Sequence, residues 1–338
     1  MKSRQESRAF EGQVVVVTGA SAGVGRATAL SFAAQGARVG LLARDPQGLE
    51  DTRAQIKVRG GTAFCVPVDM ADSTAVQAAA DTCEAELGPI TIWVNNAMAT
   101  VFSPVSKLTP DMIRRVTEVT YLGYVHGTMA ALSAMRHRGK GTIIQVSSAL
   151  AYRAIPLQAP YCAAKHAIRG FTEALRCELL SEGSAIRLSS VVLPAVNTPQ
   201  FRWAKTQMKT CPRPVAPVYE PEAAADAILH AARCQGREYF LGYQTPLLIM
   251  GNTLMPDALD HYLSRNAIEG QDTGEPVRPN RPDNLFAPVP GEHHTRGDFS
   301  REARSDALLL PAAMARALGL AALLAVGAVL SAGLGKRR

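Results

Sequence analysis

Three residues in the middle of the chain have the types and the spacing of a proton-transfer site. Ser148 precedes Tyr161 by thirteen residues, and Lys165 follows four residues after the tyrosine. Residues four apart share one face of a helix, so a helix through this stretch brings the phenol and the ammonium to the same side. A free tyrosine has a pKa of about 10, and a positive neighbour favours its phenolate. The trio therefore indicates a tyrosine that exchanges protons near neutral pH, although a Tyr-x3-Lys pair alone is equally typical of a solvated helix face.

A glycine-rich turn near the N-terminus is the second candidate site. Residues 14–26 read VVVVTGASAGVGR, which predicts a strand buried on both faces, a tight turn and the start of a helix. Glycines in such a turn let the backbone approach a pyrophosphate, and the helix N-terminus offers free N–H groups to it. A glycine triplet alone is weak evidence for a nucleotide site. Here the spacing Gly19-x3-Gly23-x-Gly25 after Thr18 resembles the TGxxxGxG motif of the short-chain dehydrogenase/reductase family.

The two motifs together extend the resemblance over about residues 9–265. It implies hydride transfer between a nicotinamide cofactor and a secondary alcohol or its ketone. In that scheme Tyr161 is the acid or base, Ser148 holds the substrate oxygen, and Lys165 tunes the phenol and reaches the nicotinamide ribose. The implied cofactor contacts at the turn are Thr18, Gly19, Ser21, Gly23, Val24 and Gly25.

The end of the predicted strand 38–43 indicates which form of the cofactor binds. An acidic side chain at this place accepts hydrogen bonds from the adenosine ribose, whereas an arginine meets a 2′-phosphate. Ala43 stands where NAD-preferring relatives carry Asp, and Arg44 follows it. This favours NADP(H). The alternative is that Arg44 only solvates a loop and that Asp45 repels a phosphate.

Further cofactor contacts are implied at the ends of later strands. Asp69, after the predicted strand 62–68, corresponds to the residue that closes the adenine pocket, unless it only caps the next helix. The segment NNAM at 95–98 resembles the family's NNAG element, and PAVNTP at 194–199 resembles its PGxVxT segment, which binds the nicotinamide carboxamide. The contacts implied in these two segments are Asn95, Ala97, Pro194, Val196 and Thr198.

Three positions depart from the family pattern. Met98 and Ala195 replace glycines, and Thr120 replaces an Asn that helps to hold a proton-relay water near the catalytic lysine. Thr120 then either keeps a shorter hydroxyl link or weakens the relay. The departures leave a second interpretation open, in which the chain is a nucleotide-binding scaffold or a redox sensor with little turnover.

Predicted strands and helices alternate through residues 13–241. This pattern predicts an α/β fold: a doubly wound, Rossmann-type, mainly parallel sheet of about seven strands with helices on both faces. We divide the chain into residues 1–265, a catalytic and NADP-binding domain, residues 266–306, a Pro-rich charged segment that lies across the domain or is mobile, and residues 307–338, an apolar C-terminal helix.

Composition argues against several other kinds of site. The net charge is +7, but the basic residues are scattered, which argues against nucleic acid as a partner. The cysteines form no CxxC pair and the histidines no metal-ligand cluster, so we predict free thiols and no metal. We expect His293 and His294 to be exposed. Aromatic and apolar residues in 200–220 favour a lid for a hydrophobic alcohol or ketone, although ordinary packing explains them equally. Relatives commonly form homo-oligomers, which the sequence neither supports nor excludes.

The sequence of the C-terminal end favours attachment to a membrane. Residues 317–335 contain no charge, and at 1.5 Å per residue such a helix spans about 28 Å, close to the thickness of a bilayer core. This predicts an anchor with the catalytic domain on the cytoplasmic side. A spanning helix would carry Lys336, Arg337 and Arg338 across, against the positive-inside tendency. A helix in the interface, a core helix or a helix docked on a partner is the alternative.

Overall fold

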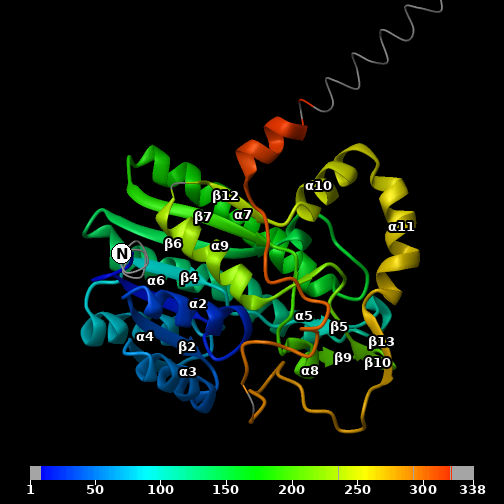
Figure 1. Ribbon diagram of the computed structural model, residues 1–338, viewed down its shortest axis with the longest axis horizontal. Helices are drawn as coiled ribbons and strands as arrows, with labels where there is room; N and C mark the ends of the chain where they lie inside the picture. Colours follow the sequence, from blue (N-terminus) through cyan, green and yellow to red (C-terminus); the bar gives the residue numbers. More distant parts are fainter. Residues whose placement is uncertain (1–8, 235, 292, 320, 322–338) are drawn as a thin grey trace, which may run out of the picture.

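The apolar runs of the sequence form one mainly parallel sheet (Figure 1). The computed structural model describes residues 9–321 apart from 235, 292 and 320. Within them the sheet has eight strands in the order β14-β12-β7-β6-β4-β1-β2-β3. The strands are β1 (Val14–Thr18), β2 (Arg38–Ala43), β3 (Thr62–Pro67), β4 (Ile92–Asn95), β6 (Lys140–Ser148), β7 (Ala185–Leu193), β12 (Glu238–Leu241) and β14 (Leu309–Pro311). Seven of these strands are parallel, as predicted, and β14 adds an antiparallel edge beside β12.

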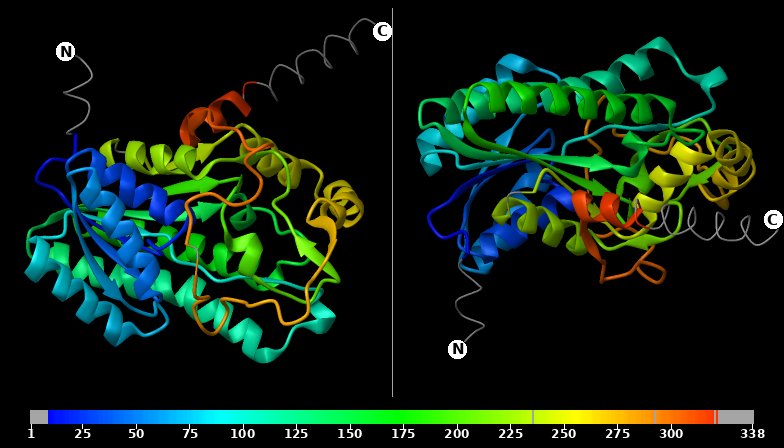
Figure 2. Two further views of the ribbon diagram at one scale, coloured as in Figure 1. Left: turned by 60° about the horizontal axis from the view of Figure 1, so that its bottom comes forward. Right: turned by 90° about the horizontal axis from the view of Figure 1, so that it is seen from above.

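Helices cover both faces of the sheet (Figure 2). One face packs against α2 (Gly23–Ala34), α3 (Pro46–Val58) and α9 (Pro221–Arg233). The other packs against α4 (Ser73–Leu87), α6 (Gly123–Arg136) and α7 (Ala159–Ser181). The central strand β1 is buried on both sides, so its four valines are apolar without alternation, whereas the edge strand β3 is only partly buried.

Shorter elements surround the carboxyl ends of the strands. They are β5 (Val101–Phe102), α5 (Pro110–Val116), a π-helical turn (Thr117–Leu122), β8 (Ala195–Val196), α8 (Gln200–Trp203), β9 (Lys205–Thr206), β10 (Thr210–Pro212), β11 (Val218–Tyr219), α10 (Gln244–Leu254), α11 (Pro256–Glu269) and β13 (Asp272–Pro276), with 3₁₀ turns at Val105–Lys107 and Ala149–Ala151.

Side-chain caps fix where several helices begin. The carboxylates of Asp45 and Asp72 accept hydrogen bonds from the backbone of the first turns of α3 and α4, at 2.8 and 2.9 Å. Asp72, and not Asp69, therefore caps α4. The Asp69 carboxylate therefore has partners other than the first turn of α4.

The predicted division at residue 265 differs from the structure. Residue 265 lies inside α11, and β13 then pairs antiparallel with β10. Beyond β13 the segment crosses the carboxyl end of the sheet, and Leu285 is fully buried against Met112 and Val116 of α5. A single apolar residue among many prolines and charges does not change the overall composition, but it contributes to the contacts that hold the segment on the domain.

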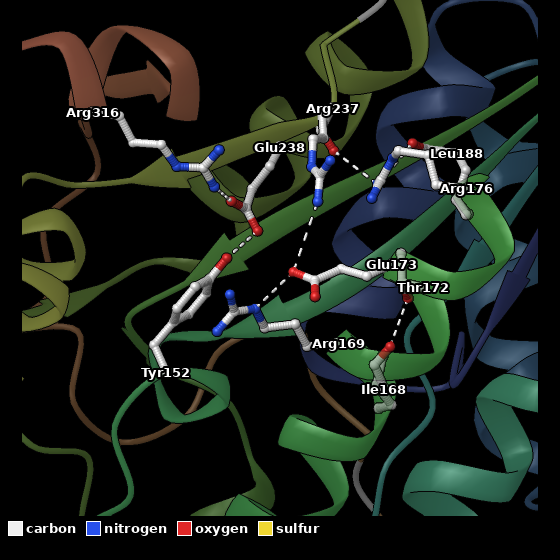
Figure 3. A network of polar contacts seen from close by, with 10 residues as sticks. All are labelled: Tyr152, Ile168, Arg169, Thr172, Glu173, Arg176, Leu188, Arg237, Glu238 and Arg316. Atoms are coloured by element: carbon white, nitrogen blue, oxygen red, sulfur yellow. Dashed lines mark hydrogen bonds and ion pairs between the residues drawn. The ribbon is translucent and has the colours of Figure 1, made fainter. Parts of the chain in front are cut away.

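The chain then returns to the far edge of the sheet. Residues 312–319 are helical, and Ala312 packs with Val192 and Phe240. Arg316 donates a hydrogen bond of 3.0 Å to Glu238 of β12, which also accepts one from the Tyr152 hydroxyl (Figure 3). The predicted membrane helix, 317–335, lies largely outside the described residues. Within the described part of the chain, no helix has the length and apolar character needed to cross a bilayer.

Candidate active site

The predicted trio meets at the carboxyl end of β6. Ser148 is the last residue of this strand, and Tyr161 and Lys165 lie one turn apart on α7. The Tyr161 phenol is hydrogen-bonded to the Ser148 side chain. The Lys165 Nζ atom lies 5.6 Å from the centroid of the Tyr161 ring and donates a hydrogen bond of 2.8 Å to the Val146 carbonyl. The fold thus places a hydroxyl, a phenol and an amine in one continuous arrangement.

Tyr124 is a fourth member of this cluster that the sequence analysis missed. Its hydroxyl accepts a hydrogen bond of 3.1 Å from Lys165 Nζ and donates one of 2.8 Å to the Val146 carbonyl. Tyr124 is buried in α6, in an apolar run where a tyrosine is typical of the core. No sequence signal distinguishes it, because its contact with Lys165 depends on how α6 packs beside α7.

Burial changes the proton affinity of both key groups. It raises the pKa of the Tyr161 phenol, and the hydrogen bond with Ser148 only partly opposes this shift. Burial also lowers the pKa of Lys165 to about 7. The sequence predicted the opposite direction for Tyr161, on the assumption of a fully charged neighbour. Because Lys165 is buried, its charged and neutral forms are present in similar amounts at neutral pH, and its influence on the phenol is weaker.

The glycine turn brings backbone segments closer than any side chain would allow. Gly19 has a φ of +69°, and a Cβ atom there would lie 2.9 Å from the Ala97 Cα atom. A Cβ at Gly25 would lie 2.1 Å from the Gly19 carbonyl oxygen. The Thr18 hydroxyl accepts hydrogen bonds from the backbone N–H groups of Asn96 and Ala97. The turn is therefore a backbone cradle that fits a pyrophosphate, and Ser21, Gly23 and Val24 line the cavity beside it.

The side chains of the neighbouring residues Arg44 and Asp45 have different partners. The Arg44 guanidinium points over the cavity and donates hydrogen bonds to the carbonyls of Leu285, at 3.2 Å, and Asn284. Burial and the nearby Arg115 lower the pKa of Arg44. The Asp45 carboxylate accepts from the Gly48 N–H and lies 2.7 Å from the His293 ring. Both residues are thus joined to the segment that follows β13, residues 277–311, which we call the extension.

Asp69 lies at the end of β3 and is paired with Arg115. The Arg115 guanidinium donates one hydrogen bond to the Asp69 carboxylate and another, of 3.0 Å, to the Leu285 carbonyl. Although burial alone raises the pKa of Asp69, its hydrogen bonds with Arg115 and the Ala71 N–H bring it below the usual value. The sequence motifs indicate Asp69 but give no sign of Arg115.

Asn95 and Thr120 are placed differently from their predicted roles. The Asn95 side chain is buried behind the site, where it accepts from Trp93 and donates to Thr128 and Gln145. Successive strand residues face opposite sides, so it is Asn96, together with Ala97, that lines the cavity. The Thr120 hydroxyl accepts from the Ala99 N–H and donates to the Ala99 carbonyl, at 2.9 and 2.8 Å. Tyr124, one helical turn further on, is the side chain that contacts Lys165.

The segment after β7 closes another wall of the cavity. Pro194, Ala195, Val196 and Thr198 all line it, and β8 is held by parallel pairing with β11. A Cβ at Gly23 would lie 3.0 Å from the Thr198 methyl group. This segment therefore packs directly against the glycine turn.

The extension crosses the cofactor half of the site, a feature that the sequence analysis left open. His293 is only 7% exposed, contrary to the prediction of exposure, because it fits between Asp45 and the Trp203 ring. The His294 carbonyl accepts a hydrogen bond of 3.0 Å from the Gly23 N–H at the start of α2. The extension residues that line the cavity are Asn284, Pro288, Val289 and His293.

The glycine turn, the cluster of Ser148, Tyr161 and Lys165, and the segment after β7 all line one cavity of about 630 Å³. It runs from the glycine turn, past Ser148 and Tyr161, to α10 and α11. Beyond the tyrosine its walls are mainly apolar and include Leu150, Ile155 and Leu248. Phe201 and Trp203 of the predicted lid also line it, whereas Met208 packs with Phe102 and Phe201. In the described part of the chain no three His, Cys, Asp or Glu side chains gather as a metal site would require, and all six cysteines are free thiols.

Comparisons with known proteins agree with this arrangement. The family model for short chain dehydrogenases matches residues 13–209. An uncharacterized oxidoreductase of Bacillus subtilis, YxnA, is 30% identical over 87% of this chain and 83% of its own length. The 17-beta-hydroxysteroid dehydrogenase 13 of Rattus norvegicus is 32% identical over 67% of this chain and 73% of its own length.

A solved structure shares the fold. It is a metagenomic short-chain oxidoreductase in complex with NADP, which is 28% identical and aligns with a TM-score of 0.57 over 68% of this chain and 96% of its own. The cradle, the Ser-Tyr-Lys cluster and these similarities lead to one assignment: the chain belongs to the short-chain dehydrogenase/reductase family and is an NAD(P)-dependent oxidoreductase that acts on CH–OH groups.

Proposed function

We propose that the protein interconverts a hydrophobic secondary alcohol and its ketone with NADP(H), and that Tyr161 is the acid or base of the reaction. The observation that carries this proposal is the hydrogen-bonded pair of Ser148 and Tyr161, with Lys165 beside the phenol, in the same cavity as the glycine cradle.

The residues divide the proton chemistry among them. Ser148 holds the substrate oxygen by a hydrogen bond, and the Tyr161 phenol gives its proton to that oxygen during reduction or takes it back during oxidation. A bound nicotinamide cofactor supplies or accepts the hydride at the carbon. Lys165 supports the phenolate, and its hydrogen bonds to Tyr124 and Val146 fix the amine beside the ring. With a pKa of about 7, Lys165 itself exchanges protons at the working pH.

The choice of NADP(H) rests on charge at the adenosine end. Ala43 leaves no carboxylate at the end of β2, and the Asp45 carboxylate is taken by the Gly48 N–H and His293. The Arg44 guanidinium lines the cavity there, whereas the Arg115 guanidinium is paired with the Asp69 carboxylate. A guanidinium such as that of Arg44 favours a 2′-phosphate over a free hydroxyl. The similar oxidoreductase solved with NADP points in the same direction.

The walls beyond Tyr161 support a hydrophobic substrate. Side chains such as Leu150, Ile155 and Leu248 are apolar, and the guanidinium of Arg213, which also lines the cavity, is paired with Glu302. Ser148 and Tyr161 supply the polar contacts at the reacting oxygen. We therefore expect a largely hydrocarbon alcohol or ketone.

Tyr161→Phe tests the mechanism. The variant keeps the ring but lacks the exchangeable proton, so turnover should fall about 10²- to 10⁴-fold while NADPH affinity stays nearly the same. Initial rates with purified protein and a panel of ketones, together with NADPH titration, measure both quantities. Tyr121→Phe is the control, because Tyr121 does not line the cavity. Turnover retained by the Tyr161 variant would show that another group moves the proton.

A further inference from the structure

Helices α10 and α11 form an arch at one side of the molecule (Figure 1). This arch exposes large apolar side chains. Tyr243, Leu247, Leu254, Met255 and Tyr262 are between 51% and 62% exposed. Helix α10 contains no charged residue, yet Thr245 is its only buried side chain. The helix therefore packs on the domain by one side only, and its other side presents apolar side chains without charges.

The exposed residues follow the periodicity of a surface stripe. Tyr243, Leu247 and Leu254 are spaced by four and seven, and Met255 and Tyr262 by seven, so each set lies along one helix face. Leu254 and Met255 stand at the tip of the arch, where α10 ends and α11 begins. Large apolar side chains exposed at regular helical spacing are typical of an interaction site.

The last described segment adjoins this arch. Ile249 of α10 and Ala315 both pack against the core cluster that contains Ala312, and Arg316 is paired with Glu238 (Figure 3). Leu308, Met314 and Leu318 of this segment are exposed as well. The sequence then continues without a charge to residue 335. The apolar arch and the uncharged end of the chain therefore begin at the same corner of the molecule.

We propose that the α10–α11 arch docks on a lipid bilayer, with Leu247, Leu254 and Met255 immersed in its interfacial region. The sequence of residues 317–335 contains no charged side chain, and the described part of this run begins beside the arch. This composition favours lipid over a second copy of the chain as the partner of the arch. Leu248 and Leu263, on the same two helices, line the apolar end of the cavity. If the proposed function holds, a hydrophobic substrate then enters from the lipid.

Tryptophan quenching tests the docking without any turnover. The full chain carrying Leu254→Trp is mixed with phosphatidylcholine vesicles whose acyl chains are either brominated or unmodified. The native Trp93 is fully buried and Trp203 lies against His293, so they provide a constant background. The control is Val58→Trp on α3, where the side chain is 88% exposed on another part of the surface.

The proposal expects vesicle binding by both variants and loss of most of the added emission only for Leu254→Trp. It also expects Leu247→Glu with Leu254→Glu to weaken vesicle binding, and Leu180→Glu, at a more exposed leucine of α7, to leave it unchanged. Absence of vesicle binding, binding without quenching at residue 254, or equal quenching of both tryptophans would overturn the proposal. So would a dimer in sedimentation that leaves Leu254→Trp unquenched, because the arch would then cover a second copy. None of these readouts depends on the reaction chemistry.

Discussion

The packing around Lys165 brings the pKa of its amine close to neutral pH. The amine is buried, its pKa is about 7, and its hydrogen-bond partners are a carbonyl and a phenol rather than a carboxylate. In the unfolded chain the pKa of a lysine is about 10.4. The folded state therefore binds fewer protons than the unfolded state between pH 7 and about pH 10, so this residue makes stability rise with pH in that window.

Lys165→Met should remove this pH dependence. Between pH 7 and pH 9 the free energy of unfolding of the natural chain should gain about 2 kcal/mol relative to the variant. Urea unfolding at several pH values measures the difference. The exposed Lys140, changed to Met, is the control and should follow the natural chain at each pH. A constant difference between Lys165→Met and the natural chain would mean that Lys165 keeps an ordinary pKa.

Arg44→Ala should separate the two cofactors. Hydrogen bonds to a charged group contribute about 1.5–3 kcal/mol, so the dissociation constant for NADPH should rise about 10- to 100-fold, and that for NADH much less. Fluorescence titration measures both constants. Arg53→Ala, at an exposed arginine of α3 that pairs with Glu50, should change neither. Equal losses for NADPH and NADH would indicate that Arg44 acts only by holding the Leu285 and Asn284 carbonyls.

At the scale of elements, the extension is a strap across the adenosine half of the cavity. It is fixed at Arg44 and Arg115 through carbonyls, at Asp45 through His293, and at the start of α2 through the His294 carbonyl. These contacts join it to the ends of β2 and β3 and to the glycine turn. A ligand in that half of the cavity lies beneath the strap, so its release depends on how firmly the strap is held.

His293→Ala should accelerate cofactor release. The variant loses the contact with Asp45 and the packing against Trp203, which lowers the barrier to opening the strap. Stopped-flow displacement of NADPH should show a several-fold faster dissociation rate. His137→Ala, at an exposed histidine after α6, is the matched control. An unchanged rate would mean that the cofactor leaves without displacement of this part of the strap.

At the scale of the whole molecule, the extension shares its core with the catalytic domain. Leu285 packs in one cluster with Val116 and Val119, and the extension ends in β14, which completes the sheet beside β12. A segment that contributes both a core residue and a strand should not unfold separately from the rest.

Leu285→Ala should therefore destabilise the entire fold. Loss of a fully buried leucine costs about 2–5 kcal/mol, and the variant should still unfold in a single transition seen alike by tryptophan fluorescence and circular dichroism. Leu180→Ala, at an exposed leucine of α7, should change stability little. Two separated transitions would show that the extension is an independent unit.

The sequence determined the parts of this protein that depend on local patterns. Apolar runs and helical spacing gave the seven parallel strands, because burial on both faces leaves little freedom in residue type. The glycine spacing predicted the cradle, and the four-residue step from Tyr161 to Lys165 placed both on one face of α7. These features are short-range, so the chain itself encodes their geometry.

Only the tertiary structure decided the contacts between distant segments. Tyr124 meets Lys165, Arg115 meets Asp69, and His293 meets Asp45 across 41, 46 and 248 positions of the sequence. Nothing in residue type or spacing marks these pairs, since each depends on how helices pack and where the extension runs. The pKa of Lys165 is of the same kind, because burial is a property of all the surrounding elements together and not of the motif.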